Sequence, residues 1–323
     1  MPPPTQEAVE RQIRSEFDAF GRAIQLPTNS VSSVEGYLRF VTTLSSFQSE
    51  QHTGQVHIFR GEGRIYRTKL TPNIARPDNC QPVQLDPHRP GMNITRQEVE
   101  EIKAFQRRPE GRNHRSFDAF RAGRWLRCDS SDWVGLVQHY GGQTRLLDVS
   151  RHGLIGLFFA CFRMPRNNEL TGEPWHAGND GVVYCLWANA HRPQSLPVEE
   201  VTIRDIEQGI PGRYLDLFEP PRVRGSQSVG RTTGRVHENV PHLYRPLRAG
   251  DAINRRLDAQ SGYLVWWHPV GEWYPHQTVP VMIDGSAKPL ILRQLYEVGV
   301  SPSTVFPDEE GDRWTAWLRN HLP

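Results

Sequence analysis

The chain has 323 residues, a length that admits one large domain or two closely packed ones. A hydrophobic fraction of 37% is ample for a core, and a formal net charge of +2 gives no overall electrostatic reason to bind nucleic acid. The four cysteines form neither a CxxC pair nor a Cys/His metal spacing, so no metal site is expected.

The sequence also predicts a cellular location. The cysteine usage favours a reducing compartment, and the N-terminus lacks the apolar stretch of a signal peptide, so we expect a cytoplasmic protein. The longest apolar stretch, residues 153–162, is about half the length of a membrane span. No membrane insertion is therefore expected.

The basic residues are almost all arginine, with lysine only at Lys69, Lys103 and Lys288. Arginine offers a planar, bidentate fork of donors that suits phosphates and carboxylates. Genomic base composition explains the same bias, so both interpretations stay open.

The first 50 residues predict two helices. Apolar residues in 5–24 recur at intervals of three and four, which is typical of an amphipathic helix. Ser32 or Ser33 can cap a second helix that runs through Phe47. We expect residues 1–50 to form a helical segment packed on the rest of the chain, because each large apolar side chain left in water would cost about 1.5–3 kcal/mol. The apolar stripe consists of Val9, Ile13, Phe17, Phe20 and Ile24.

From residue 51 onward, short strands and helices mix without a regular βαβ rhythm, which favours an α+β fold. Strands are predicted at residues 56–60, 146–150, 181–187, 263–267 and 279–283. Helices are predicted at 95–107, 129–140, 153–162, 287–298 and 313–322, and regular structure of either kind at 251–259. Residues 190–245 are rich in Pro, Gly, Arg and Ser and predict a loop-rich insertion with one short helix near 203–209. We expect residues 51–323 to be one domain that carries this insertion.

Three separated segments carry distinctive motifs. The first is Phe59-Arg60-Gly61, and the second reads QHYG-x-x-TRLLD from Gln138 to Asp148. The third reads N-x-RL-x-AQ-x-G from residue 254 to 262 and is followed by Phe-Pro-Asp at 306–308. In this order the segments resemble the FRG-domain family over about residues 55–310, with 190–245 unmatched.

That family in turn resembles the ADP-ribosyltransferase fold, a mixed, strongly bent and split β-sheet flanked by helices that clamps NAD. The resemblance implies an arginine that closes the first strand, a Ser or Thr that leads into an apolar helix at the nicotinamide pocket, and an acid on a later strand that engages the ribose. Arg60, Ser150 and Gln260 follow this order. Transferases usually have Glu at the third position, whereas this chain has Gln260, with Asp258 two residues earlier on the same face of the predicted strand.

The resemblance implies Arg60, Gln260 and Asp258 as the catalytic residues. A guanidinium binds phosphate oxygens bidentately, and glycine at position 61 lets a ligand approach the backbone. Gln260 can bond ribose hydroxyls but cannot act as a base or supply charge. The residues expected to bind NAD are Arg60, Gly61, His139, Tyr140, Thr144, Arg145, Asp148 and Ser150.

Several of these residues also have a structural interpretation. Asp148 can form a buried ion pair with Arg60 or with Arg145 instead of contacting a ligand. His139 and Tyr140 can be packed aromatic residues. Both interpretations of each residue stay open.

The predicted function is cleavage of the nicotinamide–ribose bond of NAD and transfer of ADP-ribose to an unidentified acceptor, either a protein or a nucleic acid, or to water. The alternative is a non-catalytic module of the same fold that senses a nucleotide or binds a protein. A carboxylate at the third position favours the enzyme, and Gln260 alone favours the sensor.

Overall fold

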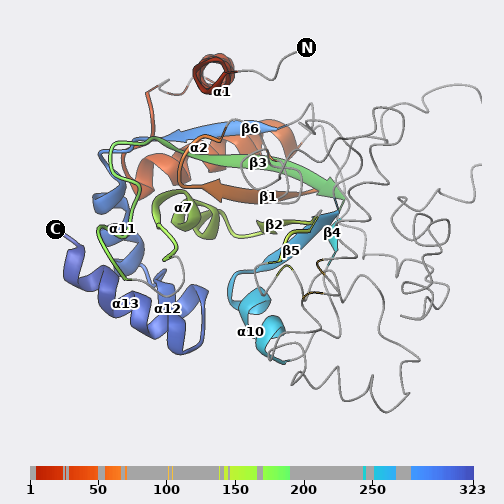
Figure 1. Cartoon of the computed structure of the whole chain (residues 1–323). Coiled ribbons are helices and arrows are strands. Elements are labelled where there is room, and N and C mark those ends of the chain that lie inside the picture. Colours follow the sequence, from red (N-terminus) through yellow and green to blue (C-terminus); the bar gives the residue numbers. More distant parts are fainter. Residues whose placement is uncertain are drawn as a thin grey trace, which may run out of the picture.

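The structure is a computed structural model, in which helices near both ends of the chain pack around a β-sheet (Figure 1). The described residues are 5–24, 26, 29–49, 55–66, 70, 101, 104, 138, 142–144, 146–165, 170–189, 243–244, 251–266 and 278–323.

The described strands form one six-stranded sheet in the order β4-β5-β2-β1-β3-β6, and every neighbouring pair is antiparallel. The strands are β1 (Gln55–Glu62), β2 (Leu146–Ser150), β3 (Gly181–Asn189), β4 (Leu243–Tyr244), β5 (Gly262–Trp266) and β6 (Val279–Ile283). Strand β1 pairs with β3 along its whole length, but its register with β2 is a single pair, Phe59 opposite Ser150. The sheet therefore has two halves, β4-β5-β2 and β1-β3-β6, which meet at a short β1–β2 junction.

The helices are α1 (Gln6–Ala23), α2 (Val34–Ser49), α7 (Gly153–Cys161), α10 (Asp251–Ala259), α11 (Lys288–Glu297), α12 (Pro302–Val305) and α13 (Glu309–His321). Helix α7 packs on β1, and α11 contacts both α7 and α2. Helix α10 precedes β5 and contacts α12, which packs on α13 (Figure 1). Together these contacts give the mixed helix-and-sheet fold that the sequence predicts.

The two N-terminal helices form where the sequence predicts them. Thr5 caps α1 by accepting from the amide of Ala8 at 3.3 Å, and Ser33 accepts from the amide of Gly36 at 3.1 Å at the start of α2. Helix α1 lies against β6, and the ring of Phe17 stacks on Phe40 of α2 with centroids 5.5 Å apart. The apolar stripe of α1 thus faces the core. The boundary predicted at residue 50 between the helical segment and the domain stays a prediction.

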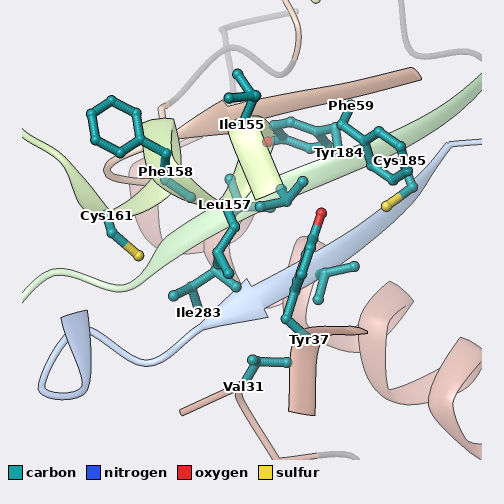
Figure 2. Close-up of a cluster of buried hydrophobic side chains, with 14 of the residues drawn as sticks. Val31, Tyr37, Phe59, Ile155, Leu157, Phe158, Cys161, Tyr184, Cys185 and Ile283 are labelled. Atoms are coloured by element: carbon teal, nitrogen blue, oxygen red, sulfur yellow. The ribbon is translucent and has the colours of Figure 1, made fainter. Parts of the chain in front are cut away.

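Helix α7 is the centre of the core. It has buried side chains around most of its circumference, as expected for a helix surrounded by protein. Figure 2 shows the core that Leu157 of α7 shares with Tyr37 of α2 and Ile283 of β6. The cysteines of this cluster, Cys161 and Cys185, are buried free thiols.

The C-terminal helix differs from its prediction. Helix α13 begins at Glu309, four residues before the predicted start at 313, because Asp308 caps it by accepting from the amide of Gly311 at 3.1 Å. The short helix α12 was not predicted, since four residues are too few to show a period. The helix predicted at 203–209 lies outside the described residues, as do nearly all of those at 95–107 and 129–140. Among the helices that are described, none has the length and apolar character needed to cross a membrane.

Candidate functional site

A pocket of about 320 Å³ lies at the β1–β2 junction, between the two halves of the sheet. This volume is at the lower end of the range for small-molecule sites. Its walls come from β1, β2, α7, α10 and the segment after α12. The lining residues are Phe59, Arg60, Gly61, Gln138, Asp148, Val149, Ser150, Phe159, Met164, Arg256, Leu257, Gln260, Leu264 and Phe306.

Arg60 projects from β1 and joins the two halves of the sheet. Its Nη1 donates to the main-chain oxygen of Asp148 on β2 at 2.7 Å, and its Nε donates to Oε1 of the buried Glu62 at 3.2 Å. These bonds use two of the five guanidinium N–H groups, so three have no partner among the described residues. The carboxylate paired with Arg60 is therefore that of Glu62. The ion pair between Arg60 and Asp148, which the sequence left open, does not form, because only the backbone of Asp148 reaches Arg60.

Gly61 lines the pocket, and the structure gives it a packing role in addition to the expected one, which stays a prediction. A Cβ at this position would lie 1.9 Å from the main-chain oxygen of Gly156 and 2.6 Å from the amide nitrogen of Ala160, both in α7. Only glycine allows α7 to approach β1 so closely. Its lack of a side chain thus serves helix packing.

The carboxylate of Asp148 is held by a chain of hydrogen bonds. Nε2 of Gln138 donates to its Oδ2 at 2.8 Å, and the hydroxyl of Thr144 donates to Oε1 of Gln138 at 2.5 Å. The same hydroxyl oxygen accepts from the amide of Leu146 at 3.1 Å. Thr144, predicted to bind NAD, is 1% exposed and does not line the pocket, so it acts on Asp148 through Gln138.

Ser150 and Gln260 meet at the other side of the junction. Ser150 Oγ donates to the main-chain oxygen of Gln260 at 2.6 Å and accepts from the amide of His152 at 2.9 Å. The side-chain Nε2 of Gln260 donates to the main-chain oxygen of Val305 at 3.2 Å. The two residues therefore connect β2 and α7 to the turn after α10 and to α12.

Asp258 and Gln260 do not share a strand, and that prediction is wrong. Asp258 lies in the last turn of α10 with an exposed side chain, and it is absent from the pocket lining. Gln260 follows in a turn, where Ser261 adopts a positive φ of 45° before β5 begins at Gly262. The helix extends to Ala259 and the chain reverses within two residues, so a strand has no room there.

Sequence reasoning did not assign a role to Arg256, although it lies in the third motif. It lines the pocket and donates through Nε to Oδ2 of Asp308 at 2.6 Å and through Nη2 to Oε2 of Glu310 at 3.0 Å. Its guanidinium also lies over the ring of Phe306, 5.6 Å from the centroid. Arg256 thus connects α10 to the start of α13. Gln138, which bonds Asp148, is the second residue of the pocket to which the sequence analysis assigned no role.

Three of the predicted site residues, His139, Tyr140 and Arg145, lie outside the described residues. In the part of the chain that is described, no three His, Cys, Asp or Glu side chains are grouped so that they could hold a metal ion.

A buried lysine lies away from the pocket, at the start of α11. Lys288 is 0% exposed and donates through Nζ to the main-chain oxygen of Gly63 at 2.6 Å. Burial lowers the pKa of Lys288 to about 8, an effect that the neighbouring Cys161 and Asp180 partly oppose. Burial also raises the pKa of Cys161 to about 12, so this thiol is inert.

The family model of the FRG domain matches residues 55–169, which hold β1, the block from Gln138 to Asp148, β2 and α7. Over these residues the chain carries an FRG domain. Arg256 and Gln260 line the same pocket from outside the matched residues. No curated protein and no solved structure matches the chain.

Proposed function

We propose that the FRG domain binds NAD at the β1–β2 junction and is an ADP-ribosyltransferase-like enzyme. The observation that carries this proposal is the pocket itself. Arg60, Ser150 and Gln260 are separated by up to 200 positions, yet all three line it, between two halves of an antiparallel sheet. The fold that the FRG motifs resemble binds NAD in a split sheet, with these three residue positions in this order.

Breaking the nicotinamide–ribose bond passes through an oxocarbenium-like state. The protein must hold the dinucleotide, orient the leaving nicotinamide and stabilise positive charge on the ribose. Three N–H groups of Arg60 have no partner in the part of the chain that is described, and they can donate to ligand oxygens. Phe159 and Phe306, in edge contact at 5.9 Å, give an apolar wall for an aromatic ring, and Asp148 supplies negative charge.

The ADP-ribose is passed to a macromolecule, a protein or a nucleic acid, or to water in a glycohydrolase reaction. We place this activity in the cytoplasm, because NAD is an intracellular metabolite and the buried Cys161 and Cys185 are unpaired thiols.

A second candidate is a sensor that binds NAD without cleaving it. It is favoured by the third position, where Gln260 carries no charge and its amide donates to Val305. Asp258, the nearest acid in the sequence, lies outside the pocket lining. The two candidates therefore differ in whether Asp148 alone supplies enough charge for the reaction.

The experiment is to measure NAD binding by calorimetry and nicotinamide release by chromatography on the same full-length protein. Binding with release supports the enzyme, and binding without release supports the sensor. The Arg39→Ala variant is the control, because Arg39 is exposed and pairs with Glu35 within α2, away from the pocket. If NAD does not bind to wild type, both candidates fail.

A further inference from the structure

We propose that Gln138 and Thr144 are positioning residues that present the Asp148 carboxylate as a hydrogen-bond acceptor, and that the pocket therefore takes the nicotinamide-ribosyl part of NAD and not its phosphates. This inference rests on the proposed function, which it deepens by assigning one part of the ligand to the pocket. It follows from the direction of the hydrogen bonds and from the charges at the site.

A backbone amide sets the direction of these hydrogen bonds. The amide of Leu146 can only donate, so Thr144 Oγ1 accepts from it at 3.1 Å. The Thr144 oxygen lies 2.5 Å from Oε1 of Gln138, a distance typical of an O–H···O hydrogen bond, and the hydroxyl is the only one of the two groups with a proton to give. The carbonyl end of the Gln138 amide therefore faces Thr144.

The amino end of Gln138 must then face Asp148. Nε2 lies 2.8 Å from Oδ2, and because the nitrogen donates, this carboxylate oxygen carries no proton. A reversed amide would instead place the Gln138 oxygen against Oδ2, where two acceptors would face each other. Thr144 thus sets the orientation of Gln138, and Gln138 sets that of the carboxylate.

The charges around the pocket also disfavour an anion. Among the described residues, two arginines, Arg60 and Arg256, line it, and both are paired with carboxylates: Arg60 with Glu62, and Arg256 with Asp308 and Glu310. With Asp148, two cations face four carboxylates, so the described lining and its ion-pair partners carry a formal charge of −2.

A pocket with this charge and a fixed acceptor suits a cation with hydroxyl groups. The oxidised nicotinamide ring is positively charged, and the attached ribose has hydroxyls that can donate to Asp148. A pyrophosphate would bring two negative charges toward the four carboxylates. The remaining N–H groups of Arg60 then donate to neutral oxygens of the ribose or the carboxamide.

The test compares two fragments of NAD by calorimetry. Nicotinamide riboside has the cation and ribose without phosphate, and ADP has the phosphates without nicotinamide. We expect wild type to bind nicotinamide riboside and NAD competitively, with ADP failing to displace either. ADP binding more tightly than nicotinamide riboside, in competition with NAD, would overturn the inference and leave the NAD proposal intact.

The positioning role is tested with a matched pair at the buried Thr144. Thr144→Val keeps the shape but removes the hydroxyl, and we expect the affinity for nicotinamide riboside to fall about tenfold. Thr144→Ser keeps the hydroxyl, so we expect this variant to bind nicotinamide riboside with wild-type affinity. If Thr144 had a purely structural role, Thr144→Val would melt at a lower temperature but, well below that temperature, would bind nicotinamide riboside with wild-type affinity. That result would overturn the positioning role of Thr144 and Gln138.

The exposed Asp148 provides a variant that does not depend on core packing. Asp148→Asn is expected to weaken nicotinamide riboside binding tenfold or more while leaving the fold intact. Unchanged affinity in this variant would contradict the inference. If nicotinamide riboside binds but NAD does not, the assignment of the pocket stands and the proposed function fails; if neither binds, both fail.

Discussion

Arg60 donates to the main-chain oxygen of Asp148 across the junction between β1 and β2, at 2.7 Å. The strand register at this junction is the single pair of Phe59 and Ser150, so the side chain of Arg60 adds a connection beside a very short ladder. The residue proposed to contact NAD is therefore also one that holds the two halves of the sheet together. Its two roles can be separated by mutation.

Replacing Arg60 with alanine should destabilise the protein. The buried Glu62 would lose its ion pair with Arg60, and the Asp148 carbonyl would lose the Arg60 donor, so we expect the free energy of unfolding to fall by about 2–4 kcal/mol. Urea denaturation measures this change, with Arg39→Ala expected to stay within about 0.5 kcal/mol of wild type. A double variant, Arg60→Met with Glu62→Leu, should recover part of the stability but no NAD binding. Recovery of binding would show that Arg60 does not contact the ligand.

Replacing Gly61 with alanine should be more damaging than any surface change. The added Cβ would overlap main-chain atoms of Gly156 and Ala160, which cannot move away as a side chain can, and we expect a loss of at least about 3 kcal/mol. Gly36→Ala is the control, since its Cβ would lie 3.3 Å from the Ser33 side chain and alanine favours a helix; its effect should stay within about 1 kcal/mol. Thermal melting compares the two, and a Gly61→Ala protein as stable as wild type would contradict the α7–β1 packing described above.

Replacing Gln260 with glutamate should raise nicotinamide release about ten- to a hundredfold, because it adds a charge that stabilises the ribosyl cation. The matched variant is Gln260→Met, which also loses the bond to Val305 but adds no charge. A rate increase in the glutamate variant alone supports the enzyme. If NAD still binds to Gln260→Glu and release stays at background, the sensor is the better description.

The buried Lys288 should make stability depend on pH in the alkaline range. Its folded pKa of about 8 lies below the value of about 10.4 for an unfolded lysine, so between these pH values the unfolded state binds more protons and the free energy of unfolding rises with pH. We expect a rise of up to about 3 kcal/mol in wild type relative to Lys288→Met.

The comparison with Lys288→Met is needed because Cys161 acts in the opposite direction. Burial raises its pKa to about 12, so above about pH 8.5 the unfolded thiol loses its proton first and stability falls in both proteins. Urea denaturation at pH 7.5, 9 and 10.5 gives the difference between them. A difference that does not change with pH would show that Lys288 keeps its charge on burial at an ordinary pKa.

The candidate site was only partly visible in the sequence. Arg60, Asp148, Ser150 and Gln260 were predicted from their order in the motifs, and the structure places all four around one pocket. The roles of Gln138 and Arg256 were not predicted, because each depends on a partner that the fold brings near: Asp148 for Gln138, and Asp308 for Arg256. The strand that was expected to hold Asp258 and Gln260 is the end of a helix and a turn.

The sequence by itself determined the local elements, because helix and strand periods and capping residues act over a few positions. The stripe of α1, the apolar α7 and the strands β2, β3 and β6 were all predicted from such patterns. Only the tertiary structure decided how β1 meets β2 and which carboxylate pairs with Arg60. Those contacts join residues as far apart as Arg60 and Asp148, and their geometry depends on strand register and on how closely α7 approaches Gly61. No pattern confined to a few neighbouring residues carries that information, because the energy of such a contact is gained only when the whole sheet has formed.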